Sequence, residues 1–284
     1  MNKVYFDNSA TTPLSSEAKK AIFEAVELFG NPSSLHTLGV EAEKAMSEAR
    51  KIILSSIGVR AVSKIDERRL IFTAGGTEAD NLALMGTAYA KNFGEGKKIL
   101  VSDSEHPAVL EPAAELERRG FKVVRIPTPG GIPDYEMIER EADRNTILAS
   151  FMLVNNETGA IYDIPRISRI IKAANPDALM HTDCVQGYMK LPISEKTLSA
   201  DLITLSAHKI GGPKGVGALY VSADILKKRQ LSPIVFGGGQ ESGMRSGTEN
   251  TIGIIGFGAA VREGIAHIAE NVQKTSTVRT HIIK

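Results

Sequence analysis

Lys209 ends the tetrapeptide Ser-Ala-His-Lys at 206–209, between an apolar stretch at 201–205 and glycine-rich residues at 210–215. The apolar stretch predicts a buried strand, so the lysine would lie at the mouth of that strand. Partial burial and a cationic neighbour lower the pKa of an amine and make it a nucleophile. Such a lysine forms a Schiff base with an aldehyde cofactor, and pyridoxal phosphate is the obvious candidate. A lone lysine after a strand is more often a surface residue, so this interpretation depends on the rest of the chain.

A phosphate site is indicated by Gly75-Gly76-Thr77, which opens a predicted helix directly after a predicted strand. Backbone N–H groups and the positive end of the helix accept a phosphate there, and the Thr77 hydroxyl adds a donor. The same three residues also form an ordinary tight turn with a helix cap, which is the commoner case.

Asp183 and Gln186 follow another predicted strand. A buried carboxylate needs a cationic or N–H partner, and the pyridine nitrogen of pyridoxal phosphate would provide one. Gln186 would donate to the phenolic oxygen of the same ring. The alternative for Asp183 is an aspartate that caps the following turn.

His106 and Asn156 are weaker candidates in predicted loops. An imidazole at His106 would stack on a cofactor ring or move protons, although most loop histidines bond to backbone. Asn156 would bind a substrate carboxylate, or it is a turn residue. Cys184, beside Asp183, is more often a small buried apolar residue than a nucleophile. The six histidines show no metal-ligand spacing, so we expect no metal.

The elements that must position these side chains alternate between strands and helices from about residue 69. Strands are predicted at 69–73, 98–102, 121–126, 146–154, 178–182, 201–205 and 216–221. Helices are predicted at 78–93, 108–119, 135–142 and 164–174, with others at about 18–29, 42–53 and 250–272. This alternation predicts an α/β fold with a mostly parallel sheet between helices, in which ligands bind beyond the carboxyl ends of the strands.

Composition limits the class of protein. The 284 residues carry 34 basic and 33 acidic side chains, a formal net charge of +1, which does not favour binding to nucleic acid or to an anionic membrane. The longest apolar run, 252–261, is shorter than a membrane span, and the first residues lack the apolar core of a signal peptide. A single cysteine excludes an internal disulfide framework. We expect a cytoplasmic protein.

Taken together, these sites resemble the cysteine desulfurases, which belong to the class V aminotransferase group of fold-type-I pyridoxal phosphate enzymes. The resemblance runs from residue 4 to about 265, and its last block is similar to the nitrogenase and iron–sulfur-cluster branch. The blocks that carry it are YFDNSATTP (5–13), GNPSSLH (30–36), FTAGGTEADN (72–81), SEHPAV (104–109), VNNETG (154–159), DCVQ (183–186), SAHKIGGPKGVGALY (206–220) and GGGQESGMRSGTEN (237–250).

The resemblance implies a role for each candidate. Lys209 would hold pyridoxal phosphate, then remove and return the Cα proton of the substrate. His106 would stack on the pyridine ring, Asp183 would pair with the ring nitrogen, and Gln186 would donate to the phenolic oxygen. Asn156 would lie near the substrate carboxylate.

The phosphate cup implied by the resemblance comprises Gly76, Thr77, Ser206 and His208. Thr248 matches a threonine that reaches the phosphate of the neighbouring subunit, so the resemblance implies a homodimer. It also implies L-cysteine as substrate and an iron–sulfur scaffold or another sulfur acceptor as partner, without nucleic acid or membrane.

The resemblance divides the chain into an N-terminal arm (1–13), a cofactor-binding large domain (14–250), and a long helix with the start of a small domain (251–284). In the family, a C-terminal domain carries the cysteine that accepts sulfur and an arginine that binds the substrate carboxylate. The sequence ends before either. We therefore expect a largely absent small domain and exposed apolar surface on the last helix, and we leave open whether this chain is active by itself.

The function expected from the resemblance is a cysteine desulfurase, which converts L-cysteine to L-alanine and passes sulfur to a thiol as a persulfide. One alternative is another class V aminotransferase or a cysteine or selenocysteine lyase, and keto-acid formation would favour the aminotransferase. A second alternative, of another class, is a non-catalytic module that binds pyridoxal phosphate, which release of sulfide from L-cysteine would exclude.

Overall fold

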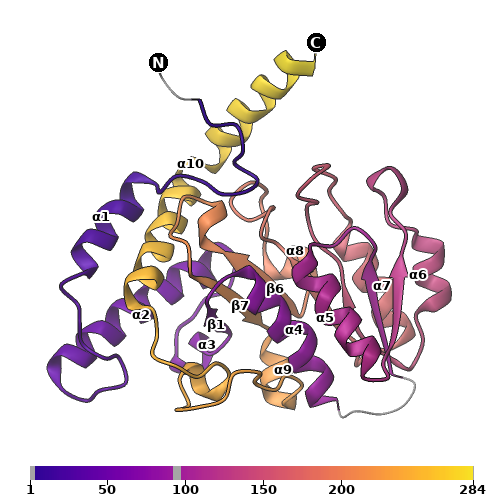
Figure 1. Ribbon diagram of the computed structural model, residues 1–284, viewed down its shortest axis with the longest axis horizontal. Coiled ribbons are helices and arrows are strands. Elements are labelled where there is room, and N and C mark those ends of the chain that lie inside the picture. The colour runs from indigo at the N-terminus through magenta and orange to yellow at the C-terminus, as the bar shows by residue number, and fades with distance from the viewer. Residues whose placement is uncertain (1–3, 92–96, 284) are drawn as a thin grey trace.

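The computed structural model describes residues 4–91 and 97–283, which form one sheet surrounded by helices (Figure 1). The strands within these residues are β1 (Leu70–Thr73), β2 (Lys98–Ser102), β3 (Lys122–Ile126), β4 (Thr146–Ser150), β5 (Leu179–Asp183), β6 (Leu202–Ser206) and β7 (Gly217–Val221). The α-helices are α1 (Ser16–Ala25), α2 (Thr37–Ser56), α3 (Lys64–Glu67), α4 (Gly76–Ala90), α5 (Pro107–Arg118), α6 (Tyr135–Glu141), α7 (Ile164–Ala174), α8 (Glu195–Leu198), α9 (Ala223–Lys228) and α10 (Thr251–Ile283). Short 3-10 helices are η1 (Pro129–Gly131), η2 (Ala207–Lys209) and η3 (Glu241–Gly243).

The strands lie in the order β1-β7-β6-β5-β4-β2-β3. Neighbouring strands from β6 to β3 run parallel, whereas β7 is antiparallel to both β1 and β6. The prediction of a mostly parallel sheet is therefore confirmed. Because β7 returns directly beside β6, the link between them needs no crossover helix, and this short connection carries Lys209.

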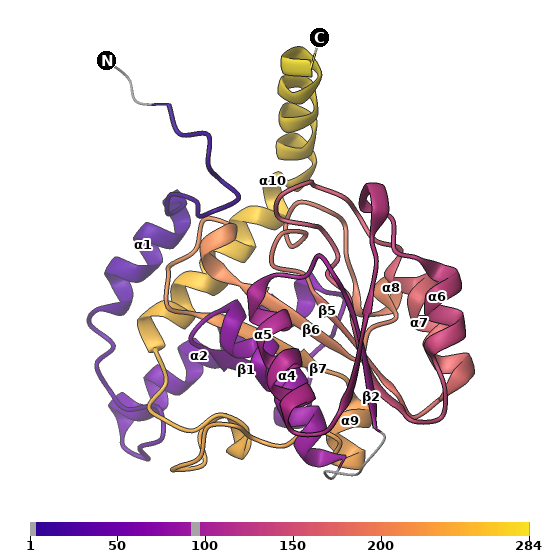
Figure 2. The ribbon, with the colours of Figure 1, turned by 45° about the vertical axis from the view of Figure 1, so that its right-hand side comes forward.

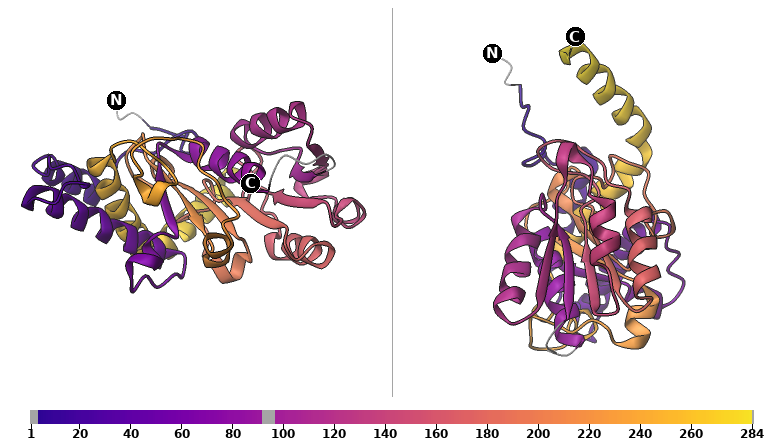
Figure 3. Two further views of the ribbon diagram at one scale, coloured as in Figure 1. Left: turned by 90° about the horizontal axis from the view of Figure 1, so that it is seen from below. Right: turned by 90° about the vertical axis from the view of Figure 1, so that its right-hand side faces the viewer.

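Alternate residues of β1 enter two different cores, one on each face of the sheet. Leu70 and Phe72 pack in the core that also holds buried side chains of α2, α6, α7 and α10. Ile71, between them, packs in the core that includes α4, α5 and α9. Side chains of a strand alternate between faces, so one apolar strand serves both cores. Helices accordingly cover both faces of the sheet (Figure 3).

Most of the predicted elements are found within a few residues of their predicted bounds, although α1 ends at Ala25 rather than at about 29 and α2 begins at Thr37 rather than at about 42. The predicted end of the helix at 78–93 lies outside the described residues. The predicted strand at 146–154 is shorter, since β4 ends at Ser150 and Val154 instead forms an isolated bridge with Ile161. The last helix does not end near residue 272 but continues to Ile283, so that prediction was wrong. The stretch after Gly264 contains no glycine or proline to stop a helix, and Lys274 pairs with Glu270 one turn earlier.

Helix α10 packs its first half against α1 and α2, and its second half projects away from the sheet (Figure 2). Glycines permit the close approach: a Cβ on Gly256 would lie 2.7 Å from Ile22, and one on Gly258 would lie 2.8 Å from Ala49. By length and composition alone α10 would qualify as a membrane span, but its first turns are buried within the domain. Ile265 and Val278 in the second half are 48% and 53% exposed, as expected of an uncovered apolar helix.

Candidate functional site

A cavity of about 660 Å³ lies beyond the carboxyl ends of β5 and β6, at the place predicted for a ligand. Its lining includes nine of the ten candidate residues: Gly76, Thr77, His106, Asn156, Asp183, Gln186, Ser206, His208 and Lys209. These residues come from five separate segments of the chain. The sheet brings them together because parallel strands end at the same edge.

Lys209 ends the 3-10 helix η2, which follows β6 directly. The turn is tight: Gly211 has a left-handed φ of 81°, and a Cβ on Gly212 would lie 2.8 Å from the Cβ of Ala207. Partial burial lowers the pKa of Lys209, while the charges of Asp183 and Asp7 act in the opposite direction. The lysine is thus placed in the cavity with a pKa shifted toward the neutral, nucleophilic amine.

The N-terminal arm reaches the same cavity, which the sequence did not reveal. The Thr12 amide donates to the carbonyl of His208 at 2.9 Å, and the Ser15 amide donates to the carbonyl of Gly211 at 2.8 Å. These bonds place the carbonyl oxygens of Ser9 and Ala10 beside Lys209, whose Nζ donates to both. The arm is therefore part of the site wall.

Asp183 ends β5, and its Oδ1 accepts the amide N–H of Val185 at 2.8 Å. Burial raises the pKa of Asp183 to about 6, although that hydrogen bond and the charge of Lys209 favour the ionised form. A protonated ring nitrogen is the kind of partner that stabilises such a carboxylate. The carboxyl group is thus suited to a cationic heterocycle.

Asp80 also lines the cavity, and it was not among the residues predicted from the sequence. It lies on α4, only 1% exposed, with Oδ1 lying 3.5 Å from Nε2 of His181. Burial and the nearby charge of Asp183 raise the pKa of Asp80 well above its usual value, and burial lowers the pKa of His181 to about 3. His181 is therefore neutral at pH 7, and Asp80 is shifted toward its protonated form. The spacing in the sequence could have indicated Asp80, because it lies three residues after Thr77 and therefore on the same face of the predicted helix.

One end of the cavity is built for an anion. Helix α4 begins after Gly75, which has no side chain to cap the first turn. A Cβ on Gly76 would lie 2.9 Å from Val185, so the backbone comes close to that neighbour. The Ser206 hydroxyl is buried without a protein partner in the described chain. Amide groups at a 15-residue helix start and a free hydroxyl make this end fit a phosphate.

His106 caps α5, and its Nδ1 accepts the amide N–H of Ala108 at 3.1 Å. Partial burial and the charge of Lys209 lower the pKa of His106, so the imidazole is neutral at pH 7. This histidine bonds to backbone, as most loop histidines do, and it also lines the cavity, while its stacking on a cofactor ring stays a prediction. A neutral ring at this position is suited to packing on a planar cofactor.

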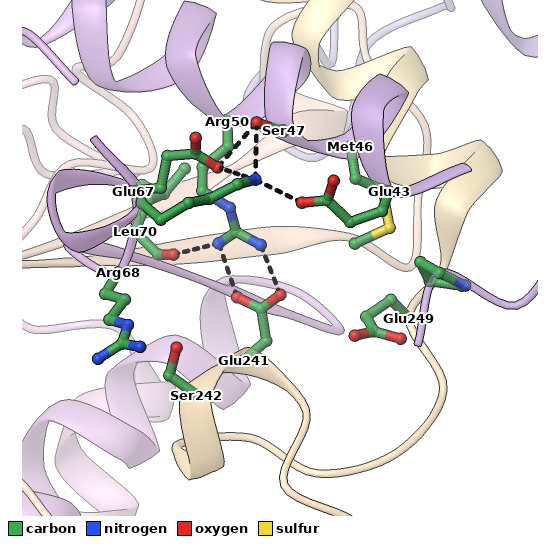
Figure 4. Close-up of a pocket in the computed structure, with 12 residues that line it drawn as sticks. Glu43, Met46, Ser47, Arg50, Glu67, Arg68, Leu70, Glu241, Ser242 and Glu249 are labelled. Carbon is green, nitrogen blue, oxygen red and sulfur yellow. Dashed lines mark hydrogen bonds and ion pairs between the residues drawn. The ribbon is translucent and has the colours of Figure 1, made fainter. Parts of the chain in front are cut away.

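Thr248 lies outside the cavity, in a smaller pocket of about 110 Å³ beside Ala74 and Gly215. Its predicted contact with a phosphate in a neighbouring subunit stays a prediction. The segment that carries Thr248 is anchored by Glu241, whose carboxylate receives two hydrogen bonds from Arg50, at 2.7 and 2.8 Å (Figure 4). A hollow of about 350 Å³ surrounds this pair, but its charged side chains are largely bonded to one another.

The residues of the main cavity fit pyridoxal phosphate. The buried Ser206 hydroxyl and the start of α4 suit the phosphate, and the buried Asp183 carboxyl suits the pyridine nitrogen. Lys209 lines the same cavity and supplies the amine that the aldehyde requires. These residues thus offer partners for the phosphate, the pyridine nitrogen and the aldehyde of the cofactor.

Comparison with known proteins supports this assignment of the cavity. Residues 4–282 match the family model described as aminotransferase class-V. The chain is 41% identical over 288 residues to the cysteine desulfurase IscS of Dictyoglomus turgidum, covering 99% of this chain and 69% of that one. It is 40% identical over 287 residues to the cysteine desulfurase IscS of Methanosarcina thermophila, covering 99% of this chain and 67% of that one.

Solved structures give the same result for the fold. A NifS-like protein superposes with a TM-score of 0.93 at 34% identity, covering 99% of this chain and 75% of that one. A structure described as SspA in complex with cysteine superposes with a TM-score of 0.83 at 35% identity, covering 92% of this chain and 72% of that one.

Proposed function

Because this chain belongs to the aminotransferase class-V family, we propose that it is a pyridoxal phosphate-dependent cysteine desulfurase. The observation that carries the proposal is the position of Lys209 and Asp183 in one cavity that also has a phosphate-binding end. Relatives named as cysteine desulfurases match nearly the whole chain, and they identify the reaction among those that such a site supports.

Pyridoxal phosphate, when bound, acts as an electron sink for negative charge that develops at the Cα of an amino acid. Lys209 would hold the aldehyde of this cofactor, and its amine would remove and return the proton at Cα of the substrate. Asp183 would hold a proton at the ring nitrogen. Thr77, Ser206 and the start of α4 would hold the phosphate, and His106 would pack on the ring.

The proposed reaction converts L-cysteine and a thiol R–SH into L-alanine and a persulfide R–S–SH. The Cβ–S bond breaks, an S–S bond forms on the acceptor thiol, and Cβ takes a proton. Cβ is reduced and the sulfur is oxidised, so no external oxidant is needed. The only cysteine of this sequence, Cys184, is fully buried, and burial raises the pKa of its thiol. The acceptor thiol in this proposal is therefore not Cys184.

The reaction is tested with the purified chain, pyridoxal phosphate, L-cysteine and dithiothreitol as the added thiol. We expect sulfide and alanine in equal amounts, and the same amounts from Cys184→Ala, because that side chain is enclosed in the core. Formation of a keto acid without alanine would favour an aminotransferase instead. A bound cofactor with no sulfide would favour a non-catalytic binding module.

We also propose that the chain acts as a homodimer that passes sulfur to an acceptor protein. Support comes from Thr248, which lies outside its own cavity, and from apolar side chains on and after α1 that remain uncovered. Phe23, Phe29 and Leu35 are 82%, 80% and 97% exposed. Large apolar side chains that are this exposed are typical of an interface. Sedimentation equilibrium should give twice the chain mass, and a monomer at micromolar concentration would contradict the proposal.

A further inference from the structure

Lys190 lies just outside the cavity, where it bonds to one of the residues that line it. Its Nζ donates to Oε1 of Gln186 at 2.9 Å. The amide nitrogen of Gln186, Nε2, faces the other way and donates to the carbonyl oxygen of Ser9 at 2.9 Å. Gln186 lines the cavity and Lys190 does not, so any effect of Lys190 on a ligand passes through Gln186.

The chain geometry between the two residues makes this bond possible. Residues 184–190 form consecutive turns after β5, with the Lys190 amide bonded to the carbonyl of Gly187 at 3.0 Å. Met189 adopts a left-handed φ of 56°, which turns the chain back toward Gln186. A Cβ on Gly187 would lie 2.6 Å from Leu153, so the turn is pressed against the neighbouring segment. The lysine is thus held beside the glutamine by the fold.

The donor and acceptor chemistry then determines which way the glutamine amide faces. An ammonium group has three donors and no acceptor, so it bonds only to the amide oxygen. The oxygen and nitrogen of a glutamine amide have almost the same shape, so its orientation follows from its partners: Lys190 bonds to the oxygen, and the carbonyl of Ser9 accepts from the nitrogen. With Lys190 on the oxygen, the amide nitrogen lies on the side of Ser9, which also lines the cavity, and its second N–H remains for a ligand. An oxygen atom of a ligand would then face an N–H donor of Gln186 rather than a lone pair of its amide oxygen.

Lys190 carries a largely buried ammonium group, which is unusual for a residue with only a structural role. Burial and the charge of Lys209 lower the pKa of Lys190 to about 8. Within residues 4–91 and 97–283 no carboxylate is paired with Lys190, and its ammonium group donates to Gln186. Burial of an ammonium costs free energy, and a single neutral acceptor returns little of it. A functional role would account for the free energy lost on burying this ammonium group, namely that its bond to Gln186 sets the orientation of a residue in the cavity.

We propose that Lys190 is a positioning residue, which fixes the amide of Gln186 so that its N–H donates to the phenolic oxygen of pyridoxal phosphate. The inference rests on the proposed function, because it needs that cofactor in the cavity. A donor on the phenolic oxygen stabilises the form in which that oxygen carries negative charge. It therefore lowers the pH at which the cofactor–lysine linkage loses its proton, which is visible as a change in the absorbance of the bound cofactor.

The test is a pH titration of that absorbance in the full chain loaded with pyridoxal phosphate, without substrate. The titratable side chains that line the cavity around the linkage are Asp80, His106, Glu157, Asp183, His208 and Lys209 itself. Asp7 acts on Lys209 through its charge, and Lys190 lies behind Gln186. We expect Lys190→Met to raise the midpoint by about one pH unit, a tenfold change in the protonation equilibrium. Lys190→Arg keeps a donor-only cation and should keep the wild-type midpoint.

A double-mutant cycle separates orientation of the amide from a simple charge effect. Gln186→Leu removes the donor, so Lys190→Met should cause little further shift when Gln186 is already Leu. If Lys190 acted only through its charge, its shift would be the same in both backgrounds and the proposal would be wrong. Lys190→Ala replaces Lys190→Met in the cycle if the methionine variant does not fold.

The outcomes also distinguish this inference from the proposed function. Wild-type protein that shows no absorbance from lysine-bound cofactor would overturn both. A wild-type protein with that absorbance, and an unchanged midpoint in Lys190→Met, would overturn the role of Lys190 alone.

Discussion

Lys209→Ala is expected to abolish the visible absorbance of lysine-bound pyridoxal phosphate and to stop release of sulfide from L-cysteine. Lys209 is the lysine whose amine lies in the cavity beside Asp183, Ser206 and His106. Alanine offers neither the covalent bond nor a group that moves the Cα proton. Removal of a residue that acts both as nucleophile and as base costs at least about 10⁴-fold in rate.

The covalent position is checked by reduction of the loaded protein with borohydride, followed by mass spectrometry of its peptides. The cofactor mass should appear on the peptide that contains Lys209 in the wild type and should be absent from Lys209→Ala. Lys227→Ala is the matched control, since Lys227 is an exposed lysine on α9. Thermal unfolding of each variant verifies that it is folded. Trapping on a different lysine of a folded wild-type chain would contradict the assignment of Lys209.

Glu241→Ala is expected to give the largest loss of stability among the charge pairs described. The side chains of Arg50 and Glu241 are 11% and 3% exposed, and Oε2 of Glu241 also accepts the amide N–H of Phe72 at 2.9 Å. The variant leaves a buried guanidinium without its carboxylate and an amide of β1 without its acceptor. Breaking a buried pair in this way costs about 3–5 kcal/mol.

Urea denaturation measures this loss as a lower midpoint at an unchanged slope. Glu43→Ala is the control from the same hollow, because the Lys64–Glu43 pair is mostly exposed, at 63% and 42% (Figure 4). That variant should lose less than about 1 kcal/mol. The double variant Arg50→Met with Glu241→Leu should lose much less than Glu241→Ala, since no charge is left buried. Equal losses in Glu43→Ala and Glu241→Ala would refute this account.

The Arg50–Glu241 pair also helps to position Thr248, the residue that is predicted to reach the neighbouring subunit of a dimer. Glu241 and Ser242 both have left-handed φ values, 48° and 58°, so the chain at this point turns sharply and is held by the bond to Arg50. Arg245, further along, bonds to Glu78 on the first turn of α4 at 2.7 Å. The segment that carries Thr248 is thereby joined to both the start of α4 and helix α2. Its position depends on contacts far from the reacting atoms.

Much of the fold and most of the site were determined by the sequence itself, for a local reason. Apolar runs such as 98–102 and helical spacing such as 164–174 are properties of short segments, and the structure forms those elements with the predicted bounds. Site residues such as Asp183 and Ser206 directly follow the predicted strands 178–182 and 201–205. In a parallel sheet those ends lie at one edge, so the sequence order alone predicted that these residues meet.

The tertiary structure alone decided which distant segments complete the cavity. Ser9 and Ala10 lie about 200 positions before Lys209, and hydrogen bonds of the arm to the turn after β6 bring them there. Asp80 meets His181 because α4 packs on the face of the sheet where that strand residue points. Lys190 meets the oxygen of Gln186 because Met189 turns the chain back. Each of these contacts depends on packing and on backbone angles that no local pattern of side chains specifies.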